Sequence, residues 1–557
     1  MESWTGEAAD VRRSWVRPAI LRGLFAVPLM VALVLGITSV GAARVLAHSV
    51  PSAAADPPGT GLAWGFNLWG QVGDGTTTNK SSPVAVDLPT GTTITTIAAG
   101  QGHSLAVTSA GTVLAWGHNN FGQLGDDTTT RRSSPVAVDL PAGTTITAVA
   151  AGDRHSLALT SAGTVLAWGD NSAGQLGDGT TNNSGTPIAV DLPAGTTITA
   201  VVAGAGHSLA VTSAGTVLAW GFNFWGQVGD GTTTNKSSPI AVNMPTGTTI
   251  TTVVAGTGHS LAVTSAGTML AWGYNSAGQL GDGTTNNSST PVAVDLPAGT
   301  TVTTVAAGER HSLALTSAGT VLAWGYNSAG QLGDGTTNNS STPVAVDLLA
   351  GTTVTTVAAG DRHSLAVTSA GTVLAWGDNA FGQLGDGTTA NKSTPIAVDL
   401  PTGSTITAAA GTRHSLAVVS STSTTTLQVT PPNPEPDQPV TLTATVTCTG
   451  STPTGTVTFH DGTATLATEP LSGNPTATAT LTGTHLAPGT HHIQARYNGD
   501  SNCPASTSNP TTVTVPKPTI PVTGANLPTI LTAGFLLTLT GTALTLATHR
   551  RRPTHEA

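Results

Sequence analysis

The sequence predicts an all-β protein in which a seven-bladed β-propeller is followed by a β-sandwich, with a hydrophobic helix near each end of the chain. Three observations predict this fold. A 52-residue unit recurs along most of the chain, each unit contains four short strand-like stretches, and the first and last units are incomplete in complementary ways. A fixed repeat period of this length is typical of repeat architectures such as propellers.

The repeated unit reads AGxxHSLAVTSAGTVLAWGxNxxGQLGDG, where x marks a variable position, and its first complete copy covers residues 99–127. Its tryptophan and its histidine recur at intervals of 52 residues, apart from one final histidine interval of 51. The tryptophans are Trp64, Trp116, Trp168, Trp220, Trp272, Trp324 and Trp376, and the histidines are His103, His155, His207, His259, His311, His363 and His414.

Four stretches of the first full unit have the composition of β-strands: residues 83–88, 93–99, 103–108 and 112–117. Alternation and β-branched residues indicate strands, and Gly, Asn, Asp and Pro separate the stretches. No window shows the period of a helix. Four strands in a unit of this length are what a propeller blade requires.

The two ends of the array complete each other. The array opens near Thr60 with GLAWG and no preceding HSLAV, and it closes at His414 with HSLAV and no following AWG. An open solenoid needs a cap at each end, whereas a ring needs its two ends to share one unit. The sequence therefore predicts a closed seven-bladed ring over residues 57–421.

The residue types of the unit predict structural roles. The glycines after Trp64 are expected at positive φ in tight turns. The indole of Trp64 is expected to pack between blades with its N–H hydrogen-bonded, and Asp74 is expected to bond the backbone of its own turn. Each histidine is expected to hydrogen-bond a neighbouring turn.

No catalytic, metal or cofactor site is predicted in the repeats, and the protein is expected not to be an enzyme. Seven histidines on a ring are too far apart for one ion, and the sequence has no HxH or CxxC pair. Adjacent strand residues point to opposite faces, so His103 and Ser104 cannot form a nucleophile–base pair. The GDG turns lack the full spacing of a calcium loop.

The unit AAGxxHSLAVTSAGTVLAWGxNxxGQLGDG resembles the repeats of the regulator of chromosome condensation family, and the resemblance covers residues 59–421. It is specific, because the glycines, the histidine, the tryptophan and the GQLGDG turn coincide in successive copies. The resemblance implies a seven-bladed propeller in which one blade is shared between the two ends of the array.

The positions that vary between copies predict a binding face. They follow AWG or precede the histidine, in loops, and loops on a rigid scaffold commonly carry recognition. Trp69 and Trp225 are expected to be exposed anchors for an unknown protein or glycan, with drift or packing beneath the loop as the alternatives. The candidate binding residues are Phe66, Trp69, Phe121, Phe222, Trp225, Tyr274, Tyr326 and Phe381.

Residues 425–516 predict a second domain, after a Pro-rich boundary at 431–436. TLTATVTC, GTVTFHDG, ATATLTG and HHIQARYNGD alternate as sandwich strands do. GTVTFHDG and ARYNGDSNC resemble a bacterial immunoglobulin-like domain, which implies a spacer. Cys448 and Cys503 are expected to form a disulfide, as in an exported protein.

Both ends of the chain predict export. Residues 1–55 contain an arginine-rich leader, an apolar run and small residues suited to cleavage, as in a signal peptide; a retained membrane anchor is the alternative. Residues 517–557 contain an apolar run at 527–547 that is long enough to span a bilayer, followed by arginines.

The C-terminal arrangement resembles the LPxTG cell-wall sorting signal of Gram-positive bacteria. The matching residues are Ile520, Pro521, Val522, Thr523 and Gly524, with isoleucine in place of the leucine. The resemblance implies that the chain engages the membrane during sorting, that a sortase cleaves after Thr523, and that the chain is joined to peptidoglycan. An ordinary membrane anchor is the alternative.

The composition further limits the functions that the protein can have. Only 9% of residues are charged, against roughly 25% in ordinary soluble proteins. The net charge is −10 with no basic stripe outside the termini, which argues against a nucleic-acid partner. We therefore expect a binding or adhesion module on the cell wall or surface of a Gram-positive bacterium. The alternatives are a β-lactamase-inhibiting propeller and, by family analogy, a guanine-nucleotide exchange factor.

Overall fold

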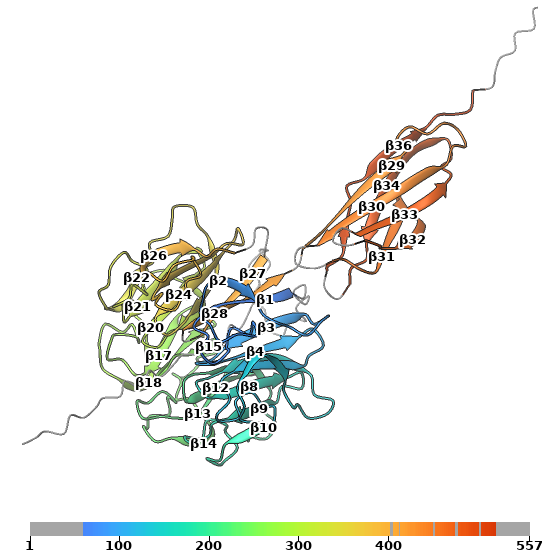
Figure 1. The fold of residues 1–557 in the computed structure, drawn as a ribbon. Coiled ribbons are helices and arrows are strands. Elements are labelled where there is room, and N and C mark those ends of the chain that lie inside the picture. Colours follow the sequence, from blue (N-terminus) through green and yellow to red (C-terminus); the bar gives the residue numbers. More distant parts are fainter. Residues whose placement is uncertain are drawn as a thin grey trace, which may run out of the picture.

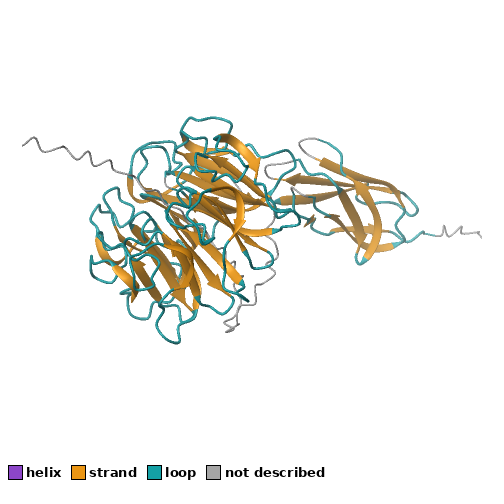
Figure 2. Cartoon of the chain, turned by 90° about the horizontal axis from the view of Figure 1, so that it is seen from below, coloured by secondary structure: helices purple, strands orange, loops and turns teal. Residues whose placement is uncertain are grey.

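A computed structural model describes residues 59–400, 405–411, 413–420, 422–448, 452–473, 477–500 and 503–519. All regular secondary structure in these ranges is β-strand (Figure 2), as the sequence predicts. Across these same ranges, no helix has the length and apolarity needed to cross a bilayer. The predicted signal region 1–55, the pentapeptide Ile520–Gly524 and the apolar run 527–547 lie outside the described residues.

Seven four-stranded antiparallel blades form the first body of the molecule (Figure 1). Within a blade the third strand carries the tryptophan and the second carries the histidine. The blades are β27(Thr405–Ala410)–β28(His414–Ser420)–β1(Gly59–Gly65)–β2(Lys80–Ala85), β3(Ile94–Ala99)–β4(His103–Thr108)–β5(Val113–Gly117)–β6(Arg132–Ala137), β7(Ile146–Ala151)–β8(His155–Thr160)–β9(Val165–Gly169)–β10(Ser184–Ala189), β11(Ile198–Ala203)–β12(His207–Thr212)–β13(Val217–Gly221)–β14(Lys236–Ala241), β15(Ile250–Ala255)–β16(His259–Thr264)–β17(Met269–Gly273)–β18(Ser288–Ala293), β19(Val302–Ala307)–β20(His311–Thr316)–β21(Val321–Gly325)–β22(Ser340–Ala345) and β23(Val354–Ala359)–β24(His363–Thr368)–β25(Val373–Gly377)–β26(Lys392–Ala397).

The outermost strand of each blade lies three residues earlier than the sequence predicts. Residues 83–88 are the predicted strand, whereas β2 covers Lys80–Ala85. Each outermost strand contains a proline, here Pro83, and an edge strand tolerates proline because its outward N–H needs no partner in the sheet. The loop of the neighbouring blade covers part of this edge, since the N–H of Gly387 donates to the carbonyl of Ser81.

The ring is closed by the two ends of the array, as predicted. β1 pairs antiparallel with β28 over seven consecutive residues, from Gly59 opposite Ser420 to Gly65 opposite His414. The first tryptophan strand therefore completes the blade that the last two strands begin, and the sheet has no free edge at this joint.

The tryptophans join neighbouring blades. All seven are fully buried. The indole N–H of Trp116 donates to the carbonyl of Gln71 in the preceding loop (2.8 Å), and the other six repeat this bond to the equivalent glutamine. Gly73, at φ 79°, lies against this indole, and a Cβ there would be 2.6 Å from the Trp116 Nε1. Glycine is therefore required at this contact.

The histidines form a closed circle between blades, which corrects the expected bond to a turn. His103 Nε2 lies 2.9 Å from the Ser156 Oγ of the next blade, and the same contact recurs around the ring until His414 meets Ser104 at 3.0 Å. Each serine donates its own proton to a glutamine carbonyl, such as Gln123. The histidine must therefore be the donor, which fixes the neutral tautomer protonated at Nε2.

The other ring nitrogen of each histidine, Nδ1, is buried without a hydrogen-bond partner, facing a glycine such as Gly152 beside His155. Protonation there would place an unsolvated charge in the interior. Burial accordingly lowers the pKa of His155 to about 4 and the pKa of His207 to about 3. The circle is neutral at physiological pH.

The ring has two different faces. The loop face consists of the loops after the tryptophan strands and before the histidine strands, residues 66–79 and 100–102 in the first copies. The stalk face is opposite. Because Gly59 pairs with Ser420, the chain enters β1 and leaves β28 at the stalk face. The second domain extends from this side, away from the loop face (Figure 1).

The second domain is a sandwich of two sheets with its own apolar core. One sheet has the order β29(Ser423–Thr430)–β30(Val440–Cys448)–β33(Ala477–Thr484). The other contains β31(Thr456–Asp461), β32(Ala464–Pro470), β34(Gly489–Tyr497), β35(Ser506–Thr507) and β36(Thr511–Val515). The predicted Cys448–Cys503 disulfide is confirmed, with 6.0 Å between the Cα atoms.

The Pro-rich segment at 431–436 is not the boundary between the domains. It connects β29 to β30, and β29 pairs with β30 over eight residues. The sandwich therefore begins before the prolines. Strand β29, in which threonine alternates with apolar residues, is therefore part of the second domain.

Candidate recognition face

All eight candidate binding residues lie on the loop face, but each is half-buried. Trp69 and Trp225 correct the prediction that they are exposed anchors. The ring of Trp69 covers Gly102 of the next blade, where a Cβ would lie 2.4 Å from the indole, and Trp225 covers Gly258 in the same way. The packing beneath the loop that the sequence left open is therefore the arrangement found for these two residues.

The side chain exposed to solvent is instead that of the residue before each of these tryptophans. Leu68 is 57% exposed and Phe224 is 67% exposed, which makes them the exposed large apolar residues of this face among the described residues. The signal was present in the sequence as FNLW and FNFW, which occur in two of the seven copies. It was missed because a tryptophan is the usual anchor of an interface.

Aromatic side chains from neighbouring blades touch in two arcs. In the first, the Phe66 ring lies 4.8 Å from Phe381 and 5.4 Å from Trp69, and Trp69 lies 5.2 Å from His118. In the second, the Trp225 ring lies 5.5 Å from Phe222 and 4.9 Å from Tyr274. Such pairs add packing energy beyond the area they bury. The two arcs therefore form a packed aromatic layer beneath the exposed residues of the loop face.

The residue before each histidine is glycine in three copies and arginine in four. Two of the three glycines, Gly102 and Gly258, lie beneath the indoles of Trp69 and Trp225. Arginine is found where a phenylalanine or tyrosine of the preceding blade supplies a ring for its guanidinium. The four stacks are Arg154 on Phe121 at 4.7 Å, Arg310 on Tyr274 at 5.6 Å, Arg362 on Tyr326 at 5.7 Å and Arg413 on Phe381 at 5.3 Å.

Three carboxyl groups lie close to these arginines. Glu309 pairs with Arg310 at 3.4 Å, and Asp361 pairs with Arg413 at 3.8 Å. Burial raises the pKa of Asp153, and the nearby negative charge of Asp361 adds to this shift. Burial also raises the pKa of Glu309, although neighbouring arginines oppose it. In both ion pairs the arginine side chain is more exposed than the carboxylate.

An asparagine amide occupies each GDG turn, and in four copies a lysine or arginine also pairs with the turn aspartate. In the first copy, the Asn67 Nδ2 donates to the carboxylate of Asp74 at 3.1 Å and to the carbonyls of Thr76 and Thr78. The Asp74 carboxylate also accepts from the N–H of Thr76, as expected for its own turn. These oxygens already have donors, and no cluster of metal-ligating side chains occurs within the described ranges.

The histidine–serine pairs have the wrong proton arrangement for nucleophilic catalysis. The Ser156 hydroxyl donates to the Gln123 carbonyl and accepts from His103, whereas a nucleophile must donate to its histidine. Both side chains are fully buried, so a substrate cannot reach them. The loop face remains as the surface on which recognition can take place.

The fold and the loop face define a class of protein. It is a closed seven-bladed propeller whose loop residues differ between blades, followed by an immunoglobulin-like sandwich. Residues 60–417 match the family described as RCC1-like domain, and residues 425–516 match that described as bacterial Ig-like domain (group 3). The chain therefore belongs to the RCC1-like domain family, and it carries a bacterial Ig-like domain after the propeller.

Known relatives share the propeller. The ultraviolet-B receptor UVR8 of Arabidopsis thaliana is 33% identical over 338 residues, which are 60% of this chain and 77% of the receptor. The E3 ubiquitin-protein ligase HERC2 of Homo sapiens is 32% identical over 364 residues, 64% of this chain but only 8% of the ligase. Yeast RCC1 (Prp20), in its crystal structure with Kap60, has a TM-score of 0.61 at 22% identity, over 69% of this chain and 94% of that one.

Proposed function

We propose that the protein is a non-catalytic recognition module that the sandwich presents at the surface of a Gram-positive cell. One observation carries the proposal. The loop face, whose residues vary between blades, lies on the side of the ring opposite the point where the chain leaves for the sandwich. A sandwich anchored at its far end would hold this face outward. The relatives' activities are not needed for this proposal, because the function rests on this chain's own loop residues.

The exposed residues of the loop face supply the test. Phe224→Ser combined with Leu68→Ser is expected to weaken binding to a surface ligand at least tenfold, because exposed apolar anchors supply much of an interface's energy. The matched control is Leu349→Ser, since Leu349 is 84% exposed in a loop of the stalk face. Full-length protein would be applied to arrays of extracellular proteins and glycans. Equal binding by the double variant and the control would exclude the loop face.

Export and wall anchoring form the second part of the proposal. The pentapeptide Ile520–Gly524 is followed by an apolar run and arginines, and the disulfide of the sandwich suits an oxidising compartment. We expect the mature chain, released from the wall by a muralytic enzyme, to end at Thr523 with a peptidoglycan fragment attached. Mass spectrometry of the C-terminal peptide measures this. A chain that still ends at Ala557 would contradict sorting and favour a membrane anchor.

A further inference from the structure

We infer that the loop face contains a site for an arginine side chain of a partner polypeptide, in an unfilled slot between two neighbouring blades. The slot is lined by Asp170 and Ala173, in the loop after one tryptophan strand, and by Gly206 and Phe222 of the next blade. This set of residues is called the open slot below. The inference rests on the proposed function, because it specifies what the loop face binds.

An equivalent slot lies between every two neighbouring blades, where the loop after a tryptophan strand meets the residue before the next histidine. In the seventh slot, Ala173 stands at the position of the indole and Gly206 at the position of the arginine, so neither blade supplies a planar group. The other six slots are filled by side chains of the chain itself. These side chains are Arg154, Arg310, Arg362, Arg413, Trp69 and Trp225.

The exposure of the three glycines shows that the seventh slot is uncovered. Gly102 and Gly258 are buried beneath their indoles, whereas Gly206 is only half-buried. A Cβ built on Gly206 would have only atoms of Phe222 within 4 Å. The space that an indole occupies above the other two glycines is therefore open above Gly206.

The alanines on the other side of the slot lead to the same conclusion. Ala277 and Ala329 hold the position of Ala173 in two other blades, and they are 6% and 5% exposed. In both of those blades an arginine fills the slot, Arg310 in one and Arg362 in the other. Ala173, which has no arginine beside it, is half-buried. Solvent therefore reaches both walls of the open slot.

The carboxylate of Asp170 gives the open slot a negative charge. Asp170 is 8% exposed, and it accepts hydrogen bonds from the N–H and the Oγ of Ser172 at 3.1 and 3.2 Å. It forms no ion pair with any described residue. Burial raises the pKa of Asp153, and the negative charges of Asp361 and Asp170 add to this shift, although Arg154 opposes it. A carboxylate as buried as Asp170 is stabilised by a cation beside it.

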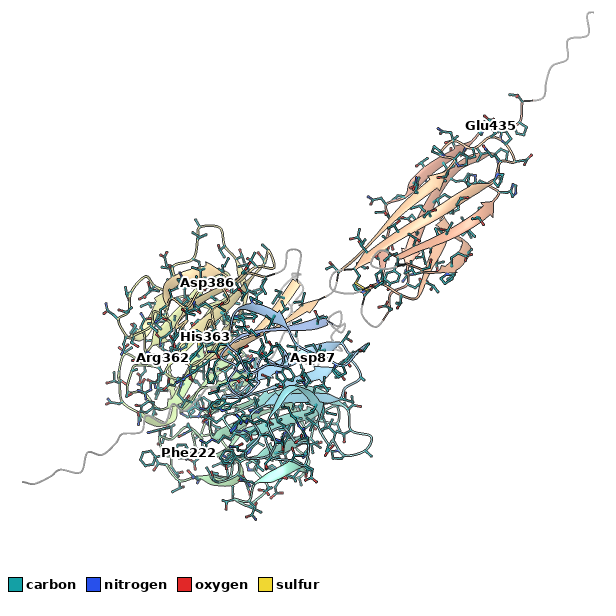
Figure 3. All side chains as sticks on the ribbon, in the orientation of Figure 1. Asp87, Phe222, Arg362, His363, Asp386 and Glu435 are labelled. Atoms are coloured by element: carbon teal, nitrogen blue, oxygen red, sulfur yellow. A yellow bond between two sulfur atoms is a disulfide. The ribbon has the colours of Figure 1, made fainter. Side chains whose placement is uncertain are left out.

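The ring of Phe222 forms the wall opposite Asp170. Phe222 holds the position of His118, whose ring lies 5.2 Å from the indole of Trp69 in the equivalent slot. Phe222 lies on the side of the propeller away from the sandwich (Figure 3), and its ring stacks with that of exposed Phe224 at 6.5 Å. A guanidinium in the open slot would pair with Asp170 and stack on Phe222. An apolar residue next to the partner's arginine would cover Phe224.

A guanidinium fits the open slot better than the other groups that the comparison suggests. An indole fills two slots of the ring, but the indole of Trp69 has an aromatic ring on each side, from Phe66 and His118. The open slot has a carboxylate on one side instead. A lysine ammonium carries the charge but lacks the planar face that stacks on an aromatic ring. The net charge of −10 also attracts a cationic partner to the molecule.

The test uses the full-length protein and an acetylated peptide amide, Gly-Leu-Arg-Leu-Gly, as the probe in calorimetric titrations. Comparison peptides carry lysine, tryptophan or citrulline in place of the arginine, and citrulline keeps the shape of arginine without its charge. We expect the arginine peptide to bind most tightly. Asp170→Asn should weaken its binding about tenfold and leave that of the citrulline peptide unchanged. Asp378→Asn is the matched control, because Asp378 accepts the equivalent bond from the Ala380 N–H at 3.3 Å beside a slot that Arg413 fills.

A second variant, Gly206→Arg, fills the open slot from the chain itself. Four other blades already carry arginine at this position, and Gly206 has no positive φ, so the ring is expected to fold. We expect this variant to lose the arginine peptide while its thermal unfolding midpoint stays at or above that of the original protein. The thermal unfolding of every variant shows whether the ring is intact.

The outcomes separate the possibilities. No binding of the arginine peptide, equal binding of the lysine or citrulline peptide, or unchanged binding in Gly206→Arg overturns the inference. Tighter binding of the tryptophan peptide assigns the slot to an aromatic ligand and also overturns it, as does an equal loss in Asp378→Asn. If Phe224→Ser with Leu68→Ser loses the surface ligand while Asp170→Asn and Gly206→Arg keep it, the proposed function stands and only the arginine site is wrong.

Discussion

Acidification from pH 7 to pH 4 is expected to unfold the propeller while the sandwich stays folded. The pKa values of the circle histidines are lowered by burial, to about 3 for His207, His259, His311, His363 and His414. In the unfolded chain they titrate near the ordinary value of about 6.5. Below that pH the unfolded state binds more protons than the folded state, so the stability falls as the pH falls.

The expected effect is large because seven groups act together. Each buried histidine removes roughly 1–2 kcal/mol per pH unit between about pH 6.5 and its folded pKa. A domain has a total stability of roughly 5–15 kcal/mol, so we expect cooperative unfolding between about pH 5 and pH 4. Asp153 and Glu309 have raised pKa values, so they oppose the loss of stability at low pH. These two groups are outnumbered by the seven histidines.

The sandwich provides an internal control with the opposite sign. His491 donates from one ring nitrogen to the Ala487 carbonyl at 2.7 Å and from the other to the Asp461 carboxylate at 2.6 Å. Both bonds, with that to Ala487 first, raise the pKa of His491. Its contribution is therefore complete below about pH 6.5 and is lost only as the pH rises through the folded pKa. Tryptophan fluorescence follows the ring and not the sandwich, because all eleven tryptophans precede residue 377.

One substitution tests the histidine explanation directly. In His259→Gln, the amide nitrogen of glutamine can still donate to the Ser312 Oγ, but the group no longer titrates. We expect a shallower pH dependence, by about one proton of the seven, and an unfolding midpoint at lower pH. Unfolding of the ring that starts only below pH 3, or an unchanged proton number in the variant, would show that the circle is not the acid-sensitive element.

Deletion of residues 59–65 is expected to remove most of the stability of the ring. This strand supplies the seven paired residues opposite β28, and it contains Trp64, whose indole donates to the Gln383 carbonyl at 2.9 Å. Loss of a buried tryptophan alone costs about 3–5 kcal/mol. The total loss, more than about 5 kcal/mol, is a large part of what a domain has.

A synthetic peptide of residues 59–66 tests whether the effect comes from closure. Added to the truncated chain, it should restore the urea midpoint of ring unfolding in a concentration-dependent manner, since a ligand that binds only the folded state stabilises it. The same peptide with Trp64→Ala is the matched control and should restore little. If the truncated chain unfolds at the midpoint of the intact chain, the ring does not depend on this joint.

Much of the candidate site could be predicted from the sequence, because its positions vary between repeats that are otherwise nearly identical. The loops after each tryptophan and before each histidine were identified in this way, and all eight candidate residues lie on one face. Which of them meet solvent was not accessible. Phe224 is exposed because Trp225 beside it lies over Gly258, a residue 33 positions further along and in the next blade.

The sequence by itself determined the all-β class, the seven blades and the closed ring. These follow from the repeat period and from two incomplete ends, which are properties of the linear chain. Only the tertiary structure decided the partner of each histidine and the aromatic ring on which each of the four arginines stacks. Those contacts join residues on different blades, as for His103 and Ser156, 53 positions apart, or Trp116 and Gln71, 45 apart. A local pattern contains no information about which side chains meet across an interface between sheets.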